Sequence, residues 1–426
     1  MTMINAYTAD DENRLSDVER DLVERRIRVL GPSYRLFYEH PVHVVRGEGV
    51  WLYGPNGECY LDVYNNVAVA GHCHPHIVAA IARQAAILNT HTRYLTEGVI
   101  DYAERLITKF PPPISQLMFA CTGSEANDLA VRVARAHTGG SGLIVTETAY
   151  HGVTQAIAEL SPSLGRHVEI GAHVRTVPAP RTSGDVGRAF ADGVSAALED
   201  MRRASVKPAA LLVDTVFASD GVFAHPPGFL GEAVERVRAA GAVFIADEVQ
   251  AGFARLGDAF FGFERHGLTP DLVTMGKPMG AGHPLSALAG KPEVLEKFGH
   301  MSRYFNTFGG NPVSCAAGMA VLDVIEGEDL MGNARRVGVL LKNALLELAA
   351  RYGAIADVRG VGLFIGAEME NERIAARIVN GLRERRILIS ATGPGANILK
   401  IRPPLVFSEA NLDQFISALG AELAVL

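Results

Sequence analysis

Residues 273–282 read VTMGKPMGAG and place a single lysine, Lys277, directly after an apolar run. The run is typical of a buried strand, and the glycines and the proline around the lysine are expected to exclude a helix there. Lys277 is therefore expected at the exit of a strand, the edge at which open α/β sheets bind their ligands. Two interpretations follow: a structural lysine paired with an acid, or an amine that takes part in chemistry.

Outward from this segment, strand-like and helix-like stretches alternate from about residue 100 onward. In GSEANDLAVRVARAH, the residues Ala126, Leu129, Ala130 and Val133 recur at the spacing of one helix face. Continuous apolar strands separated by helices predict an α/β fold with a mostly parallel central sheet covered by helices. The strand-like runs are LMFACTG, GLIVTET, AALLVDT, AVFIADE, DLVTMGK and LSALAG.

The pattern changes on both sides of this region, and the chain divides into three predicted parts. Residues 1–60 contain a charged helix, DVERDLVERRIRVL, and a hairpin around the turn GPNGE. Residues 61–310 form the large domain with the central sheet. Residues 311–426 mix long helices with short strands, which predicts a smaller α+β domain that the N-terminal segment joins.

Composition excludes several classes of function. The chain has 426 residues, a formal net charge of −7 and no basic stripe, so we expect no nucleic-acid partner. Its four cysteines are scattered without a CxxC pair, which favours a reducing compartment over a disulfide scaffold. The first twenty residues lack an apolar signal region, and no apolar run approaches the roughly 20 residues of a membrane helix. We therefore expect a cytoplasmic protein without a membrane partner.

Several expected strand ends carry polar residues that would converge on one crevice: the turn at Gly123, Asp214, Asp247 and Lys277. A lysine in an apolar pocket has a lowered pKa and can attack an aldehyde. Pyridoxal phosphate (PLP) enzymes need such a lysine together with an acid that keeps the ring nitrogen protonated. Asp247, one helical crossover before Lys277, is the candidate acid, although an aspartate there can also be a helix cap or a loop residue.

The remaining candidates are weaker when each is taken alone. CTGSEAND predicts a turn followed by a helix whose N-terminus, with Ser124, would bind a phosphate. Tyr150 would stack on a cofactor ring or simply pack. His72 and His74 share a face if the backbone is extended, but no third metal ligand is evident, so we expect no metal.

Five motifs, in this order and spacing, resemble the class-III aminotransferase family of PLP enzymes: TGSEAND, AYHG, FIADEVQAGFAR, DLVTMGKPMG and FNTFGGNP. The resemblance implies PLP fold type I and a homodimer with its active site at the subunit interface. It also implies that Lys277 forms the Schiff base and that Asp247 pairs with the pyridine nitrogen. The other implied cofactor contacts are Gln250 near the ring hydroxyl, Tyr150 on the ring face, Gly123 and Ser124 at the phosphate, and Thr307 reaching the phosphate from the neighbouring subunit.

Two departures from the usual family pattern concern the substrate. In NILKIRPPL, Lys400 stands where family aminotransferases have an arginine that binds the substrate carboxylate, and Asp214 stands where they have the glutamate that neutralises this arginine. A lysine cannot reproduce the two parallel hydrogen bonds of an arginine. The loop LDVYNNVAVAGH is also about two residues shorter than usual and carries Asn66 and its neighbouring asparagine.

Both departures resemble the phospholyase branch of the family, which acts on ethanolamine phosphate or phosphohydroxylysine. The expected reaction is the elimination of phosphate from O-phosphoethanolamine or a related phosphoamine, giving an aldehyde, ammonia and phosphate. The alternatives are an ω-aminotransferase that uses pyruvate or glyoxylate, and a non-catalytic PLP-binding protein. The candidate substrate-binding residues are Asn66, Arg93, Asp214, Lys400 and Arg402.

Overall fold

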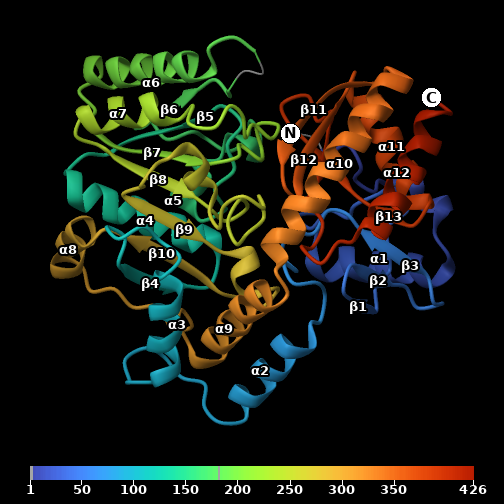
Figure 1. Ribbon diagram of the computed structural model, residues 1–426, viewed down its shortest axis with the longest axis horizontal. Coiled ribbons are helices and arrows are strands. Elements are labelled where there is room, and N and C mark those ends of the chain that lie inside the picture. The colour runs from blue at the N-terminus through green and yellow to red at the C-terminus, as the bar shows by residue number, and fades with distance from the viewer. Residues whose placement is uncertain (1–2, 181–182) are drawn as a thin grey trace.

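A computed structural model describes residues 3–180 and 183–426 of the chain (Figure 1). Its largest sheet has seven strands in the order β4-β10-β9-β8-β7-β5-β6. The strands β9, β8, β7, β5 and β6 are parallel, whereas β10 runs antiparallel to both β4 and β9. The strands are β4 (Gln116–Ala120), β5 (Gly142–Thr146), β6 (Val174–Val177), β7 (Pro208–Asp214), β8 (Val243–Asp247), β9 (Leu272–Met275) and β10 (Ser286–Gly290).

Helices cover both faces of this sheet, as Figure 1 shows. One face packs against α6 (Val186–Arg203) and α7 (Gly231–Ala239), and the other against α4 (Gly123–Thr138) and α8 (Pro292–Met301). Successive residues of β7 enter different cores, because side chains alternate between the faces of a strand: Leu211 packs on the α6 side and Leu212 on the α4 side. The expected α/β architecture with a mostly parallel sheet is therefore confirmed.

Two four-stranded sheets form the other lobe of the molecule. One has the order β11-β12-β15-β14 and the other β1-β2-β3-β13. The parallel pairing of β3 with β13 joins the N-terminal hairpin to the C-terminal part of the chain. The division into domains at residues 60 and 310 stays a prediction. The strands are β1 (Arg46–Glu48), β2 (Trp51–Tyr53), β3 (Cys59–Asp62), β11 (Ile355–Val361), β12 (Phe364–Met369), β13 (Ile387–Leu388), β14 (Ser390–Thr392) and β15 (Ile398–Ile401).

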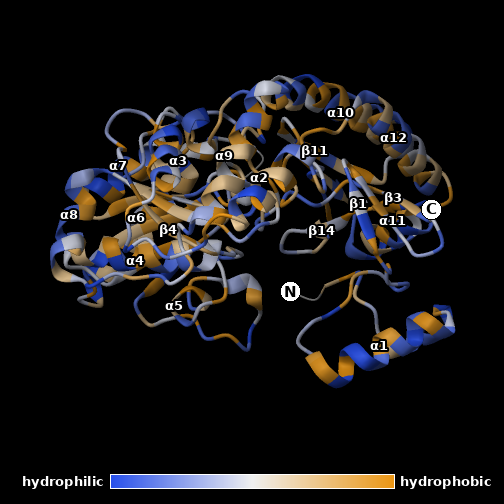
Figure 2. Ribbon diagram, turned by 90° about the horizontal axis from the view of Figure 1, so that it is seen from below, coloured by the Kyte–Doolittle hydropathy of each residue, from blue (hydrophilic) through white to orange (hydrophobic). Residues whose placement is uncertain are grey.

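The remaining helices surround these sheets, and Figure 2 shows α1 set apart from the rest of the chain. None of the helices among the described residues is both long and apolar enough to cross a membrane. These helices are α1 (Asp17–Leu30), α2 (Pro75–Ala85), α3 (Glu97–Ile107), α5 (Gln155–Ala158), α9 (Pro312–Gly327), α10 (Leu330–Tyr352), α11 (Glu372–Glu384) and α12 (Glu409–Leu423), with the 3₁₀ helices η1 (Ala9–Arg14), η2 (Pro162–Leu164), η3 (Gly262–His266) and η4 (Lys277–Gly280).

Two local expectations were wrong. The crossover from β8 to β9 contains the 3₁₀ helix η3 rather than an α-helix, and residues with positive φ turn its chain at Phe253, Ala254, Gly257 and Gly267. The segment that follows Gly276 is also not free of helix. It forms the single 3₁₀ turn η4, which starts at Lys277 and ends before a left-handed residue, Ala281.

Candidate active site

Lys277 lies at the carboxyl end of β9 and is the first residue of η4. Its φ of 35° is unusual for a residue with a side chain. The preceding Gly276 allows a close approach, because a Cβ there would lie 3.2 Å from the backbone nitrogen of Gly123. Burial and then the positive charge of Arg402 lower the pKa of Lys277 to about 8, against the opposing charge of Asp247. The structure thus holds an amine of lowered basicity at the strand exit.

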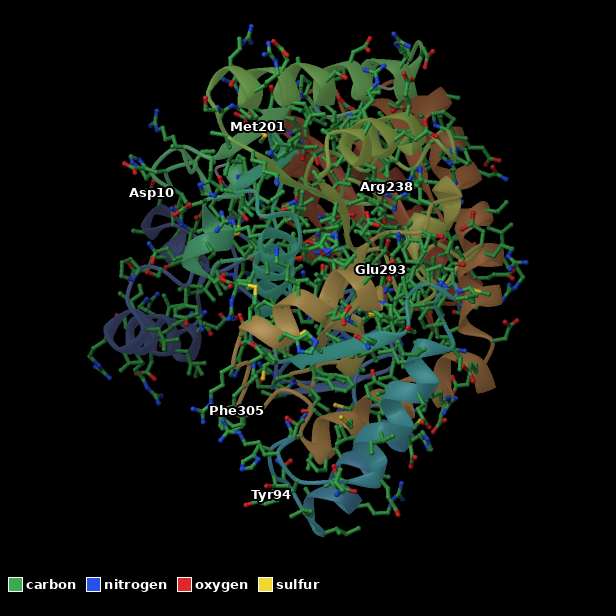
Figure 3. All side chains as sticks on the ribbon, turned by 90° about the vertical axis from the view of Figure 1, so that its left-hand side faces the viewer. Asp10, Tyr94, Met201, Arg238, Glu293 and Phe305 are labelled. Carbon is green, nitrogen blue, oxygen red and sulfur yellow. The ribbon has the colours of Figure 1, made fainter. Side chains whose placement is uncertain are left out.

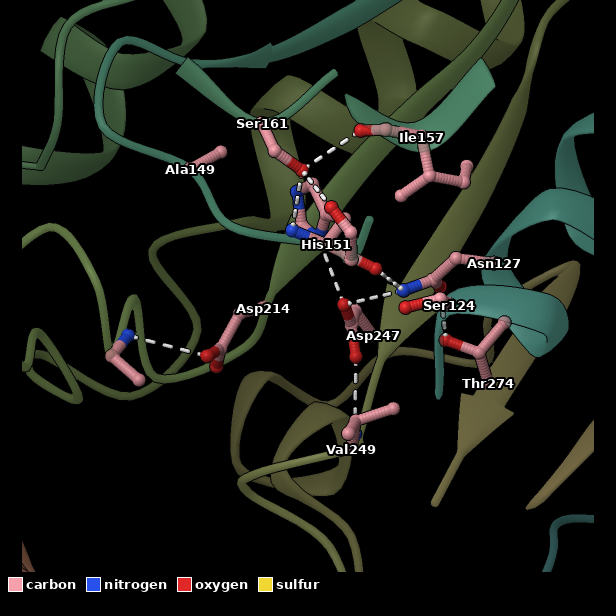
Figure 4. Close-up of polar contacts among 12 residues, drawn as sticks. Ser124, Asn127, Ala149, His151, Ile157, Ser161, Asp214, Asp247, Val249 and Thr274 are labelled. Carbon is pink, nitrogen blue, oxygen red and sulfur yellow. Dashed lines mark hydrogen bonds and ion pairs between the residues drawn. The ribbon is translucent and has the colours of Figure 1, made fainter. Parts of the chain in front are cut away.

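Asp247 ends β8 and is the centre of a buried hydrogen-bond network (Figure 4). Its Oδ2 accepts hydrogen bonds from Nδ1 of His151 at 2.7 Å and from Nδ2 of Asn127 at 2.9 Å, and its Oδ1 accepts one from the Val249 amide at 3.1 Å. Burial alone would raise the pKa of Asp247, but these hydrogen bonds and the His151 ring outweigh it, so the pKa lies below its usual value. Asp247 is therefore held as a carboxylate.

Sequence reasoning missed the two side chains that position Asp247. His151 and Asn127 lie inside the motifs AYHG and TGSEAND, yet neither received a role. His151 is 4% exposed, and its Nε2 has no hydrogen-bond partner among the described residues. Asn127 is fixed in turn, because its Oδ1 accepts a hydrogen bond from Thr274 at 2.6 Å and its Nδ2 also contacts the backbone oxygen of His151. The two motifs contain both residues and could have drawn attention to them. The contacts that give these residues a role form only in the folded chain.

A first cavity of about 310 Å³ lies between Lys277 and the N-terminus of α4. Gly123 and Ser124 line it, and Thr122 caps the helix by accepting a hydrogen bond from the Glu125 amide. A Cβ on Gly123 would lie only 3.0 Å from the side chain of Val249, so glycine keeps this wall open. Other residues of the wall are Tyr150, His151, Asp247 and Gln250.

A second cavity of about 480 Å³ shares Lys277 and Val67 with the first. Arg402 and Asn66 lie in its wall and are 7% and 2% exposed. Nη1 of Arg402 donates to Oδ1 of Asn66 at 2.8 Å and to Oε1 of Gln250 at 2.5 Å, and the guanidinium lies 4.5 Å from the ring centre of Tyr64. The two cavities therefore meet at the lysine, with a fixed arginine on one side.

Asp62 shapes the short loop that carries Asn66. Its Oδ1 accepts hydrogen bonds from the amides of Tyr64 and Asn65 at 3.0 and 2.8 Å, and its Oδ2 contacts Nε2 of His72 at 2.8 Å. The carboxylate is 2% exposed. Because it satisfies three donors at once, it fixes the loop that follows β3 and so places Asn66 beside Arg402.

Arg255 connects this loop region to the rest of the molecule. It is 1% exposed, and its Nη1 donates to the backbone oxygens of Leu363 and Pro403. Pro403 follows Arg402 directly, so Arg255 fixes the backbone that carries the site arginine. Burial, followed by the charge of Arg402, lowers the pKa of Arg255 to about 9.

The two histidines that were considered as metal ligands each contact a carboxylate instead. His72 contacts Asp62, and His74 contacts Glu328 at 3.0 Å. Cys73 between them has a φ of 52°, so the backbone is not extended and the two histidines do not share a face. Within residues 3–180 and 183–426, no group of three or more histidine, cysteine, aspartate or glutamate side chains is placed to hold a metal ion.

Four candidates lie outside the walls of both cavities in the described part of the chain: Arg93, Asp214, Thr307 and Lys400. Arg93 is exposed and stacks on the ring of Phe305 at 3.8 Å, and Thr307 is also exposed. Lys400 is 6% exposed and lies behind the site on β15. Asp214 accepts hydrogen bonds from the amides of Val216 and Ala218. Burial and the charge of Asp247 raise the pKa of Asp214 to about 6. The roles assigned to these four candidate residues stay predictions.

The residues of the first cavity suit PLP. An amine of lowered pKa, a buried carboxylate and an open helix N-terminus line the same wall. These groups match the aldehyde, the ring nitrogen and the phosphate of the cofactor, in that order. Tyr150, which is 37% exposed, supplies an aromatic face in this wall.

Comparisons with known proteins place the chain in a family. The class-III aminotransferase model matches residues 37–423. An alanine–glyoxylate aminotransferase 2-like protein of Drosophila melanogaster is 36% identical over 93% of this chain and 85% of its own length. An ethanolamine-phosphate phospho-lyase homologue of Caenorhabditis elegans is 34% identical over 96% of this chain and 94% of its own.

A solved structure agrees with these sequence relatives. A phospholyase from Arthrobacter in complex with phosphoethanolamine superposes with a TM-score of 0.92 and 41% sequence identity. The match covers 95% of this chain and 100% of the Arthrobacter chain. The chain therefore belongs to the class-III aminotransferase family, has PLP fold type I and is a PLP-dependent enzyme.

Proposed function

We propose that this enzyme is a phospholyase that eliminates phosphate from O-phosphoethanolamine or a related phosphoamine. The observation that carries the proposal is the likeness to the phosphoethanolamine-bound Arthrobacter phospholyase, at 41% identity over its whole length. The cation-lined cavity beside Lys277 supports it, because a leaving phosphate needs positive charge near the reacting carbon. The products would be an aldehyde, ammonia and phosphate.

The residues of the first cavity would carry the proton transfer. PLP, when bound, supplies an electron sink for negative charge on the carbon that carries the substrate nitrogen. Nζ of Lys277 would remove the proton from that carbon, and its pKa of about 8 keeps much of the amine neutral at mildly alkaline pH. Asp247, kept ionised by His151 and Asn127, would hold the proton on the ring nitrogen.

The residues of the second cavity would bind the leaving group. Arg402 and Asn66 present donors beside Lys277, where the bond between the adjacent carbon and the phosphate oxygen breaks. The electron pair of that bond leaves with the phosphate. Water then hydrolyses the released two-carbon fragment to acetaldehyde and ammonia, so atoms balance with one water consumed per turnover. General-base catalysis of this kind typically contributes about 10²–10⁴-fold to the rate.

A class-III ω-aminotransferase that uses pyruvate or glyoxylate is the second candidate. It is favoured by the 36% identity with the alanine–glyoxylate aminotransferase 2-like protein of Drosophila melanogaster. The same lysine and aspartate would serve that reaction. The difference lies in whether phosphate leaves before the cofactor takes the amino group.

We also propose a cytoplasmic homodimer in which Thr307 completes the cofactor site of the neighbouring subunit. The exposed position of Thr307, outside the cavity of its own chain, supports this arrangement. All four cysteines are free, which supports a reducing compartment.

A phosphate-release assay without any keto acid separates the two reactions. Purified holoenzyme is incubated with O-phosphoethanolamine, phosphohydroxylysine and a longer phosphoamine, and inorganic phosphate is measured. Continuous release from at least one substrate is expected. If no phosphate appears while alanine and an aldehyde exchange the amino group, the enzyme is an aminotransferase and the phospholyase proposal is wrong.

A further inference from the structure

A third cation, Arg35, lines the second cavity beside Lys277 and Arg402. It belongs to the segment between α1 and β1, more than 300 residues from Arg402 in the sequence. Its side chain is exposed, and it makes no ion pair or hydrogen bond with the described residues that would occupy its guanidinium. Nothing in the sequence motifs singled it out.

The wall of this cavity also contains buried donors without partners. Nδ2 of Asn66 and Nε of Arg402 are inaccessible to solvent and bind no acceptor within the described residues. Buried polar groups are almost always hydrogen-bonded in folded proteins. Asn66 and Arg402, which both line this cavity, thus carry donors that no group of the described residues satisfies.

The cavity is also short of negative charge. Its one carboxylate among the described residues is Asp62, which already accepts from two amides and from His72. The same wall contains three groups that can carry positive charge: Arg35, Arg402 and the amine of Lys277. The excess of positive charge in this lining favours an anion with several acceptor oxygens.

We propose that Arg35, Asn66 and Arg402 form the subsite for the substrate phosphate, with Arg35 selecting the doubly charged group at the cavity mouth. This inference rests on the proposed phospholyase function and specifies where its phosphate binds. Arg402 is held in place by Gln250 and Tyr64, so it serves as the fixed side of the subsite. Arg35 is exposed and supplies the second guanidinium from the N-terminal segment.

The position of the subsite suits the reaction. In phosphoethanolamine the phosphate sits on the carbon next to the one that carries nitrogen, so its binding groups must adjoin the base. Lys277 lies in the wall of both cavities, whereas Arg93 and Lys400 lie in neither. Arg35 thus takes the role for which the sequence suggested Arg93.

The test is Arg35→Gln in the holoenzyme, with Arg28→Gln as the matched control. Arg28 is an exposed arginine of α1 that lines neither cavity. A hydrogen bond to a charged group contributes about 1.5–3 kcal/mol, which is roughly 10–150-fold in affinity. Because Arg35 is exposed, we expect the lower end: KM for phosphoethanolamine rises about tenfold in R35Q, kcat changes less than threefold, and R28Q matches the wild type.

Calorimetric titration of holoenzyme with inorganic phosphate measures the affinity of the subsite for phosphate in the absence of turnover. R35Q should weaken phosphate binding about tenfold, and Arg35→Lys should weaken it less because the charge remains. If the wild type releases phosphate from phosphoethanolamine but R35Q binds and turns over like the wild type, the role of Arg35 is refuted while the phospholyase function stands. If the wild type neither releases phosphate nor binds it, the proposed function and the subsite are both wrong.

Discussion

Burial and the guanidinium of Arg402 together set the basicity of Lys277, the side chain on which the proposed chemistry depends. The amine must be neutral to attach an aldehyde or to accept a proton. An ordinary lysine, with a pKa near 10.4, is almost wholly charged at pH 8, whereas a lysine with a pKa of about 8 is about half neutral. This difference can be measured on the apoenzyme.

The rate at which apoenzyme takes up PLP should rise with pH and level off above about pH 8. The sign follows from the lowered pKa: protonated Lys277 dominates below it and cannot react. Stopped-flow absorbance across pH 6.5–10.5 measures this rate. In Arg402→Met, loss of the neighbouring charge should move the midpoint upward, whereas Arg402→Lys keeps the charge and should move it less. A wild-type midpoint near 10.5 would contradict the assignment.

Lys277→Ala should abolish the adduct that borohydride reduction traps between protein and PLP. The reason is that Lys277 Nζ is the amine in the wall of the first cavity. Intact-mass spectrometry after reduction measures the adduct. Lys400→Ala, a lysine outside both walls, is the control and should retain it. Trapping in K277A at the wild-type level would place the aldehyde on another residue.

His151 is a positioning residue that acts through Asp247. His151→Leu removes the 2.7 Å hydrogen bond, so burial should raise the pKa of Asp247 and activity should fall about 10–100-fold. His151→Asn retains a donor and should recover part of the loss. The acid limb of the pH–rate profile should move to higher pH in H151L. If both variants match the wild type in activity and in pH–rate profile, His151 does not position Asp247.

Sequence reasoning predicted the residues whose position depends on local pattern. Lys277 and Asp247 follow short apolar runs that are typical of buried strands, so their convergence at one sheet edge could be inferred. Asn127, His151 and Arg35 could not be placed in the same way, since their contacts join segments far apart in the chain. His151, for example, meets Asp247 across 96 residues.

Individual elements were predictable where the residues that signal a turn or a helix N-terminus lie close together in the sequence. The helix DVERDLVERRIRVL is α1 (Asp17–Leu30), and the GPNGE turn joins the antiparallel strands β2 and β3. The antiparallel direction of β10 was not predictable, because an apolar run reads the same in either direction. The 3₁₀ crossover before β9 was missed because positive φ occurs there at Phe253 and Ala254, residue types that do not signal a turn, as well as at Gly257 and Gly267.

A single buried carboxylate, Asp62, holds the loop after β3. Asp62→Ala leaves two amides and the His72 ring without an acceptor in a buried site. We expect a loss of about 2–4 kcal/mol in the free energy of unfolding, measured by urea denaturation. His72→Ala removes one of the three contacts and should cost less. A loss below 1 kcal/mol in D62A would show that the carboxylate does not fix the loop.

A group of exposed apolar side chains lies at residues 94–95 and 305–308. Tyr94, Leu95, Phe305 and Phe308 are 65%, 94%, 38% and 68% exposed. Figure 3 labels Tyr94 and Phe305 on the same side, and the ring of His91 contacts both. A gathering of large apolar side chains on a surface is typical of an interface. Thr307, next to Phe308, would then reach the partner's cofactor.

Phe308→Glu should therefore dissociate the proposed dimer. Burying a carboxylate in an apolar interface is unfavourable, and sedimentation equilibrium should show a shift from dimer to monomer. Val339→Glu, at an exposed apolar position on α10, is the control and should stay dimeric. F308E should also retain less PLP, because Thr307 would no longer reach the cofactor of the neighbouring subunit. A wild-type monomer with full PLP occupancy would contradict the shared site.

In the proposed reaction, the amine at Lys277 and the cations beside it drive loss of phosphate rather than transfer of the amino group. The most direct test is to measure phosphate, acetaldehyde and alanine together when the holoenzyme acts on O-phosphoethanolamine with pyruvate present. We predict one phosphate for each acetaldehyde, without alanine, and none of the three from K277A. Alanine formed in step with substrate consumption, without phosphate, would contradict the account.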